Sequence, residues 1–331
     1  LYTGNGSTQS ITGVGFQPDF VWTKSRTTTQ SHVLTDAVRG VTKTLFTNAT
    51  QAEATLSGIT AFGTDGYTLG ASDLWSENST SFASWNWLGA NGTASNTTGS
   101  IDSTVSANTT SGFSIVSYAG NSTAGATIGH SLGVAPKMII VKDRDGADSW
   151  VVYHNSLAIT EYLILNSTSA ALTDNEVIFY DTDPTSSVFT VGAHNTVNQS
   201  GHNYIAYCFA EKQGYSKFGS YTGNGSTDGT FVYTGFKPAF VMIKATGLVK
   251  NWLTFDNRRL GYNGAGTNKQ LHPNTNGTES SGNGTTLDIL SNGFKTRTTD
   301  SDENGSGQNY IYMAFAENPF VASNFVPTTA R

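Results

Sequence analysis

The stretch GFKPAFVMIK, at residues Gly235–Lys244, has two close relatives elsewhere in the chain. Residues Gly15–Lys24 read GFQPDFVWTK, and residues Gly133–Lys142 read GVAPKMIIVK. In each copy a Gly and a Pro, three residues apart, lead into an apolar run that ends at a Lys. Self-similarity of this kind outweighs local patterns when a fold is inferred. The sequence therefore predicts one structural unit that is built three times.

Further motifs recur in the same order around these stretches. An opening motif, YTGNGST, begins at Tyr2 and again at Tyr221, and a shorter version, YAGNST, begins at Tyr118. In every copy the next predicted strand starts eight positions after the strand-ending Lys. Length differences between the copies fall in polar stretches, as expected for loops. Three units follow from this alignment, at residues 1–92, 113–214 and 215–331.

The composition predicts the fold class of these units. Only 13% of the residues are charged, and Gly, Ser, Thr and Asn are abundant. Such a composition disfavours helices and suits short strands joined by tight turns. We therefore expect an all-β protein with three tandem, related β-sandwich domains, jelly-roll-like, with short turns and little helix. Short helices are candidates only at residues 36–43 and 51–56.

The junctions between the units differ in composition. Residues 93–112 are nearly all Gly, Ser, Thr and Asn, and they form either a flexible linker or an added edge strand. Units two and three are joined directly, so we expect a stiff pair and a looser first unit. The tail at residues 320–331 carries several apolar side chains. It is expected to pack on its own unit or on a neighbouring subunit.

Charge and hydropathy exclude some partners. A net charge of −6 without a basic patch argues against nucleic acid. No apolar run reaches the roughly 20 residues that a membrane-spanning helix needs, so membrane insertion is not expected. The single cysteine, Cys208, lies in an apolar run and is interpreted as a buried thiol. The chain starts at Leu1 rather than Met, which is typical of a fragment or a processed product.

No pattern in the chain predicts catalysis or a cofactor. The position twelve residues after the strand-ending Lys holds Asp36, His154 and Asp256, which are interpreted as polar residues at strand ends. His32 corresponds to Trp150 and Trp252 and is expected to fill a packing position. The histidines show no HxH or HExxH spacing, and no GxSxG motif accompanies a His and an Asp. The sequence thus predicts a protein that is not an enzyme and holds no metal.

Two acidic loops leave a calcium site open as the alternative. Asp300, Asp302 and Asn304 match the first half of a calcium-binding loop, but Ile311 stands where the bidentate Glu belongs. Asp143, Asp145 and Asp148 form a second cluster in a predicted hairpin. Ordinary turn chemistry of Asp, Asn and Gly is the preferred interpretation of both loops.

Aromatic side chains are the best candidates for ligand recognition. Trp75 lies in a polar loop, has no apparent equivalent in the other copies, and would stack on a sugar if exposed. A Trp that covers its own core is the preferred interpretation of Trp75, and the alternative is that Trp75 and the neighbouring Asp73 are ligand-binding residues. Trp85 and Trp87 occupy core positions of the closing strand. Thirteen Asn-x-Ser/Thr sequons are consistent with glycosylation or simply with Gly-rich turns.

Taken with the repeated opening motif YTGNGST, two further motifs give the sequence a family resemblance: GFxPxFVxxK and the closing YIYMAFAENPF at Tyr310–Phe320. The chain resembles tail-fibre-type virion structural proteins of tailed marine bacteriophages, a group largely known as domains of unknown function. The resemblance covers nearly the whole chain. It implies a structural or host-recognition role in a virion or another extracellular location, and it brings no catalytic residues with it.

These observations combine into one hypothesis with two alternatives. The expected protein is a non-enzymatic virion protein that forms a homo-oligomer, as a trimer or a filament, joins other virion proteins and contacts host surface glycans. The first alternative is a purely architectural subunit, in a capsid decoration or an extracellular filament, without any ligand. The second is a polysaccharide depolymerase, for which the candidate carboxylates are Asp36, Asp73, Glu77 and Asp256.

Overall fold

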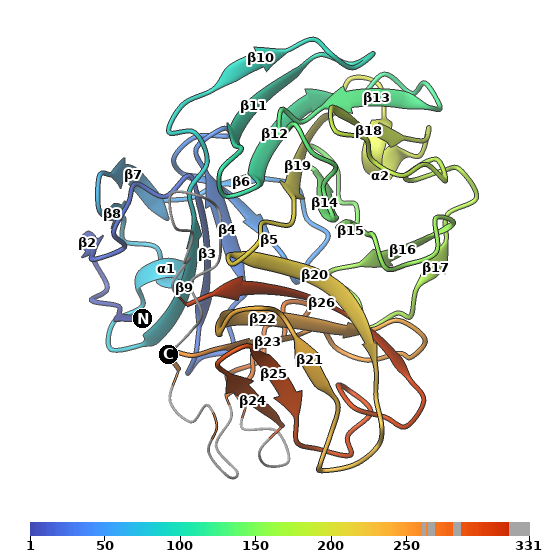
Figure 1. The fold of residues 1–331 in the computed structure, drawn as a ribbon. Helices are drawn as coiled ribbons and strands as arrows, with labels where there is room; N and C mark the ends of the chain where they lie inside the picture. The colour runs from blue at the N-terminus through green and yellow to red at the C-terminus, as the bar shows by residue number, and fades with distance from the viewer. Residues whose placement is uncertain (260–262, 264–268, 281–285, 318–331) are drawn as a thin grey trace.

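The computed structural model describes residues 1–259, 263, 269–280 and 286–317, and these are built mainly of strands (Figure 1). The first unit contains β1 (Tyr2–Thr3), β2 (Gln9–Thr12), β3 (Phe20–Ser25), β4 (Val33–Asp36), β5 (Lys43–Phe46), β6 (Ala54–Thr55), β7 (Ile59–Gly63), β8 (Gly66–Leu69), α1 (Asp73–Ser76) and β9 (Ser81–Trp87). The second contains β10 (Ala94–Asn96), β11 (Ser103–Asn108), β12 (Phe113–Ala119), β13 (Ala126–Gly129), β14 (Met138–Asp143), β15 (Val151–His154), β16 (Glu161–Ile164), β17 (Leu172–Thr173), β18 (Val188–Val191), α2 (Asn195–Asn198) and β19 (Asn203–Phe209). The third contains β20 (Ser216–Thr222), β21 (Phe231–Tyr233), β22 (Pro238–Ala245), β23 (Leu253–Asp256), β24 (Leu287–Leu290), β25 (Gly293–Thr296) and β26 (Asn309–Ala316).

Each unit is a sandwich of a large and a small antiparallel sheet. The large sheets have the orders β1-β9-β3-β4-β5-β6, β10-β11-β12-β19-β14-β15-β16-β17 and β20-β26-β22-β23. The small sheets are β2-β8-β7, β13-β18 and β21-β25-β24. The prediction of an all-β sandwich fold is confirmed. The two helix candidates are wrong, because residues 36–43 and 51–56 form strand ends and turns, as their short polar stretches between strands favour.

Both faces of the central strands of each large sheet are buried, which explains the continuous apolar strands of the repeated motif. Alternate side chains of one strand point in opposite directions. One set enters the core of its own sandwich, such as Val21, Val141 and Val241. The other set enters a cluster shared by all three units, here called the central core. From the repeated strands it receives Phe20, Trp22, Met138, Ile140, Phe240 and Met242.

The central core joins the units into a closed ring. Trp150 of the second unit donates its Nε1–H to the carbonyl of Phe46 in the first, 2.9 Å away. Trp252 of the third unit donates in the same way to Ile164 of the second. The third unit meets the first through Arg26, which forms an ion pair with Glu279. The expectation of a looser first unit is wrong, because the first unit contributes to the central core as the others do. Figure 1 shows the strands of the first unit beside those of the other two.

Residues 93–112, which were expected as a linker or an edge strand, contain two strands. β10 and β11 extend the large sheet of the second unit at its edge, where β11 pairs with β12 over six residue pairs. Ser103 and Ser106 are buried there. The described part of the chain contains no helix long and apolar enough to cross a membrane. The predicted packing of the tail at residues 320–331 lies outside the described residues.

The opening motif forms the same set of contacts with the closing part of each unit. In the second unit, Tyr118 stacks on Tyr204 and donates its hydroxyl to the carbonyl of Val197 in α2. The Oδ1 atom of Asn121 accepts the amide N–H of Thr123, which makes the turn. Gly120 lies so close to the backbone that a Cβ atom there would come 2.3 Å from the carbonyl oxygen of Gln199. The first Gly of the opening motif is therefore required by close backbone approach.

Gly120 of the opening motif gives the first prediction. Gly120→Ala is expected to lower the free energy of unfolding by about 2–4 kcal/mol, because the backbone of the neighbouring turn has to move. Gly92→Ala is the matched control, since a Cβ atom at Gly92 meets nothing within 4 Å. The control is expected to change stability by less than ~0.5 kcal/mol. Chemical denaturation of both variants measures the difference, and equal stabilities would contradict the steric argument.

Candidate interaction site

Trp75 is completely buried, as the preferred interpretation of a Trp that covers its own core requires, so its candidate role in ligand binding is wrong. It lies in α1 and belongs to the core of the first sandwich. The glycine at position 58 makes room for the indole, since a Cβ atom there would lie 2.3 Å from Trp75 Nε1. Asp73 is exposed at the first residue of α1. The structure thus separates the two predicted ligand-binding residues into a core residue and a surface residue.

Trp75 also has equivalents in the other units, which the sequence comparison missed. The carbonyl groups of Trp75, Val197 and Glu303 each accept the hydroxyl of the Tyr that begins the opening motif of their own unit. Glu303 thus stands where the other units have apolar side chains. Burial raises the pKa of Glu303 well above its ordinary value, and among the described residues its Oε1 atom has no hydrogen-bond partner.

Carboxylates of both acidic loops form contacts with other residues of the protein. Asp302 forms an ion pair with Lys250 at 2.7 Å. The Oδ1 atom of Asp143 accepts two backbone amides of its own turn, and its Oδ2 atom contacts His202 Nδ1 at 2.8 Å. That contact raises the pKa of His202. Within the described part of the chain, no group of three or more His, Cys, Asp or Glu side chains is arranged to hold a metal ion.

Several sequons also lie in the interior. Asn198 and Asn304 are completely buried. The Oδ1 atom of Asn304 accepts the amide of Asn224, and Asn198 accepts that of Asn121 in the same way. These four Asn residues all belong to sequons, and their contacts favour the interpretation as turns at these positions.

The polar residues at the ends of the second repeated strands connect neighbouring units. Asp36 accepts the hydroxyl of Tyr207 from the second unit at 2.7 Å. Asp256 of the third unit accepts the Nε1–H of Trp85 at 3.2 Å. His154 of the second unit instead lies with its Nε2 atom 3.2 Å from a carbonyl oxygen, that of Tyr312. A carbonyl only accepts hydrogen bonds, so this seam needs a donor where the other two seams use a carboxylate.

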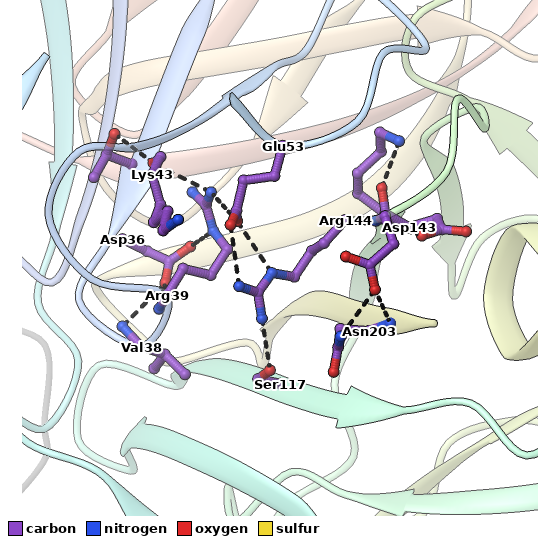
Figure 2. Close-up of polar contacts among 12 residues, drawn as sticks. Asp36, Val38, Arg39, Lys43, Glu53, Ser117, Asp143, Arg144 and Asn203 are labelled. Atoms are coloured by element: carbon purple, nitrogen blue, oxygen red, sulfur yellow. Dashed lines mark hydrogen bonds and ion pairs between the residues drawn. The ribbon is translucent and has the colours of Figure 1, made fainter. Parts of the chain in front are cut away.

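The seam between the first and second units contains a buried cluster of charges (Figure 2). The carboxylate of Glu53 receives Arg39 from its own unit and both Nε and Nη2 of Arg144 from the second unit, at 3.0–3.1 Å. Arg39 also pairs with Asp36, and its side chain is inaccessible to solvent. Burial opposes the charge of Arg39, but Asp36, Tyr207 and Glu53 together hold its pKa above the ordinary value.

The third seam repeats this cluster, and the second seam lacks it. Glu279 accepts Arg26 of the first unit and Arg259 of its own unit. Arg259 in turn pairs with Asp256. Between the second and third units, the backbone contact that corresponds to Glu53–Arg144 joins Ala171 to Thr246. At that seam the Asp, Arg, Glu and Arg of the cluster are replaced by His154, Leu157, Ala171 and Thr246.

The remaining candidate residues are buried or form hydrogen bonds within the protein. His32 is completely buried beside Trp22 and Trp85, as its predicted packing position requires. Burial lowers its pKa well below the ordinary value. Trp85 and Trp87 belong to the central core, as predicted. Glu77 accepts hydrogen bonds from three side chains in its own unit, those of Thr28, Gln30 and Thr80.

A cleft of about 520 Å³ lies at the seam between the third and first units. The strand β9 forms one wall, with Ser84 and Asn86 partly exposed at its edge. Trp87, Phe240 and Phe315 provide an apolar floor. Asp256, Arg258 and Glu317 also line the cleft. It combines an apolar interior with an open strand edge, a combination suited to a polypeptide.

Sequence reasoning missed both the charged clusters and the cleft. A signal for the clusters exists: Arg26 and Arg144 stand two residues after the repeated Lys, and Thr246 stands there in the third copy. Their acidic partner lies in a loop of variable length, where alignment fails. The cleft has no local signal, because it depends on how the third unit meets the first.

The first charged cluster gives the second prediction. Glu53→Gln is expected to lower the free energy of unfolding by about 3 kcal/mol, because it leaves the partly buried Arg144 without a carboxylate and the buried Arg39 with Asp36 alone. Glu211→Gln is the control, since the ion pair of Glu211 with Lys217 is about one-third exposed. The control is expected to cost less than ~1 kcal/mol. A loss at Glu53 no larger than that of the control would refute the role of the cluster.

The buried Glu303 gives the third prediction. Its pKa is raised on folding, so the folded state loses stability relative to the unfolded state as the pH rises above about 4.5. Glu303→Gln keeps the shape and removes the titration. The variant is expected to be more stable than the parent by ~1–3 kcal/mol at pH 8, with the difference shrinking towards pH 4. Urea denaturation across this range measures it, and a difference independent of pH would rule out the explanation.

Comparison with known proteins gives the family of the chain. A family profile described as a domain of unknown function (DUF7483) matches residues 1–319. No curated protein and no solved structure matched the chain. The match covers nearly the whole of the three-unit ring, including all three opening motifs and the residues that line the cleft. The chain therefore belongs to the DUF7483 family.

Proposed function

We propose that this chain is a non-enzymatic structural subunit of the tail-fibre type, located in a virion or another extracellular assembly. The observation that carries the proposal is the cleft at the third seam, where a partly exposed strand edge borders an apolar floor. Such a surface is suited to joining one polypeptide to another. The repeated motifs that resemble tail-fibre-type proteins support the same role.

The rest of the ring supports a scaffold role. The strand-ending Lys of each copy is fully buried, and its Nζ atom donates to carbonyl oxygens of the segment that follows it. Burial lowers the pKa of Lys142 to about 8. Three such lysines and two buried charge clusters hold loops and seams in place. A rigid particle of this kind holds the partners that it joins at fixed positions relative to one another.

Contact with host surface glycans is the second part of the proposal, and it no longer rests on Trp75. The strand β21 carries two exposed aromatic side chains on one face, Phe231 with 45% and Tyr233 with 63% of its surface accessible. The corresponding strand of the first unit has Ser10 and Thr12 at these positions. Adjacent exposed aromatic rings suit the apolar faces of sugars.

The two alternatives predict different behaviour. A purely architectural subunit would assemble without binding any glycan. A depolymerase would need two free carboxylates across a groove. Of its candidates, Asp36, Asp256 and Glu77 all accept hydrogen bonds within the protein. These contacts favour a structural use of the carboxylates, and incubation with surface polysaccharide tests the enzymatic alternative.

Light scattering of the native protein tests the assembly role. We expect a particle mass that is a multiple of the 35.1 kDa chain, or a mixed particle when other fibre proteins are present. EDTA is expected to leave the mass unchanged, because Asp302 and Asp143 are engaged by Lys250 and His202. A monomer that joins no partner would contradict the assembly role, and dissociation by EDTA would favour the calcium alternative.

Glycan arrays test host contact. The double variant Phe231→Ala and Tyr233→Ala is expected to lose about tenfold or more of any glycan affinity, because both stacking faces disappear. Val249→Ala is the matched control, since Val249 is an apolar side chain with 72% of its surface exposed. An equal loss of glycan affinity in both variants, or no glycan binding by the parent, would contradict host contact and favour the architectural alternative.

A further inference from the structure

One position of the repeat carries a tryptophan at two seams and a histidine at the third. Trp150 and Trp252 each donate an indole N–H across their seam, to the carbonyls of Phe46 and Ile164. His32 is the equivalent residue of the first unit, since it too stands eight positions after the repeated Lys and donates its backbone N–H to an Asn side chain of its own unit. The third seam therefore lacks, among the described residues, the indole bond that the other two seams have.

The residue that faces His32 across the third seam is a second histidine. His272 stands where the other seams have Phe46 and Ile164, since each of the three follows a completely buried Leu. The ring of His32 faces the main chain of His272, but neither of its nitrogen atoms has a hydrogen-bond partner among the described residues. The third seam thus contains two imidazole rings at positions where the other seams have an indole and an apolar side chain.

The surroundings of His32 oppose a positive charge on its ring. His32 is completely buried beside the rings of Trp22 and Trp85. The charged groups that act on it are Lys24 of its own unit and Arg259 of the third, and protonation of His272 would add another cation. Burial and these cations lower the pKa of His32 well below its ordinary value.

The carboxylates near the two histidines are engaged by other cations. Asp256 and Glu279 accept hydrogen bonds from the same arginine. Asp302, which acts on His272, forms its ion pair with Lys250 at 2.7 Å. Burial lowers the pKa of His272, although Asp302 opposes this shift. Both imidazoles are therefore neutral in the closed seam near pH 7.

We infer that the third seam is an acid-sensitive switch: protonation of His32 and His272 opens the ring between the third and first units, while the three sandwiches keep their own cores. An imidazolium in the closed seam would lie buried beside cations, whereas water solvates it in the open seam. Acid therefore favours the open form. Each sandwich has a hydrophobic cluster of its own besides the central core, so one seam can open without global unfolding.

Proton linkage ranks the three seams by their acid sensitivity. A histidine that is neutral in the closed seam and charged in the open one favours opening about tenfold for each pH unit below 6.5, down to its lowered pKa. The second seam contains one buried histidine, His154, whose pKa burial lowers to about 4. The first seam has Asp36 and Trp150 at the corresponding positions. The third seam should therefore open most readily in acid, followed by the second.

Hydrogen exchange at three equivalent amides tests the inference. The N–H groups of Glu279, Ala171 and Glu53 donate to main-chain carbonyls across the third, second and first seams. Their protection factors are measured by NMR at about pH 7.5 and at about pH 5. Over this range we expect losses of at least ~100-fold at Glu279, about 30-fold at Ala171 and less than ~threefold at Glu53.

Two outcomes of the exchange experiment would overturn the inference. Equal losses at the three seam amides would show that the histidines do not single out the third seam. A loss as large as that of Glu279 in the central strands β3 and β22 would show global unfolding instead of seam opening. Retained protection in β3 and β22 together with the expected ranking supports the switch.

Substitutions of the two histidines identify the groups that respond to acid. His32→Phe removes two ring nitrogens that have no hydrogen-bond partner among the described residues, and His272→Phe introduces the residue type that the first seam has. The double variant is expected to reduce the acid-induced loss at Glu279 to less than ~threefold and to leave that at Ala171 unchanged. His202→Gln is the control, since His202 is a partly exposed histidine of the second unit. A loss at Glu279 that is as large in the double variant as in the control would refute the role of the two histidines.

Discussion

The burial of one face of each large sheet against the other two units is the constraint on which this structure depends. Phe20, Met138 and Phe240 are equivalent residues, and all three are buried in one central core. A single unit would expose this face to water, at a cost that grows with its apolar area. The three copies are therefore parts of one folding unit rather than independently folding domains. The seams between them have to be closed.

Closing the seams forces polar groups into the interior, and the chain solves this in two ways. Two seams bury an Arg–Glu–Arg cluster with an added Asp, in which every charge has a partner. The remaining seam has His154, Leu157, Ala171 and Thr246 and carries none of these charges. An unpaired buried charge costs more than the absence of the whole cluster. This explains why the four positions change together.

The sequence predicted the repeat, the all-β class and the core strands, because each depends on patterns within one unit. The placement of Trp85 and Trp87 in the core was predicted for the same reason. Burial of Trp75 was the preferred interpretation, but a ligand-binding role stayed open because its polar neighbours hide that Gly58 makes room for the indole. The clusters and the cleft depend on contacts between units. No pattern within one copy carries that information.

An internal repeat supplies its own control for separating structure from function. Positions that keep the same role in all three units, such as the buried Lys and the Tyr of the opening motif, are accounted for by folding. Departures of one copy fall into two kinds. Those at the second seam are compensated by neighbouring changes, so they too belong to folding. The exposed Phe231 and Tyr233, and the buried Glu303, whose Oε1 atom has no hydrogen-bond partner among the described residues, are not matched by such changes. Folding alone does not explain why such departures persist.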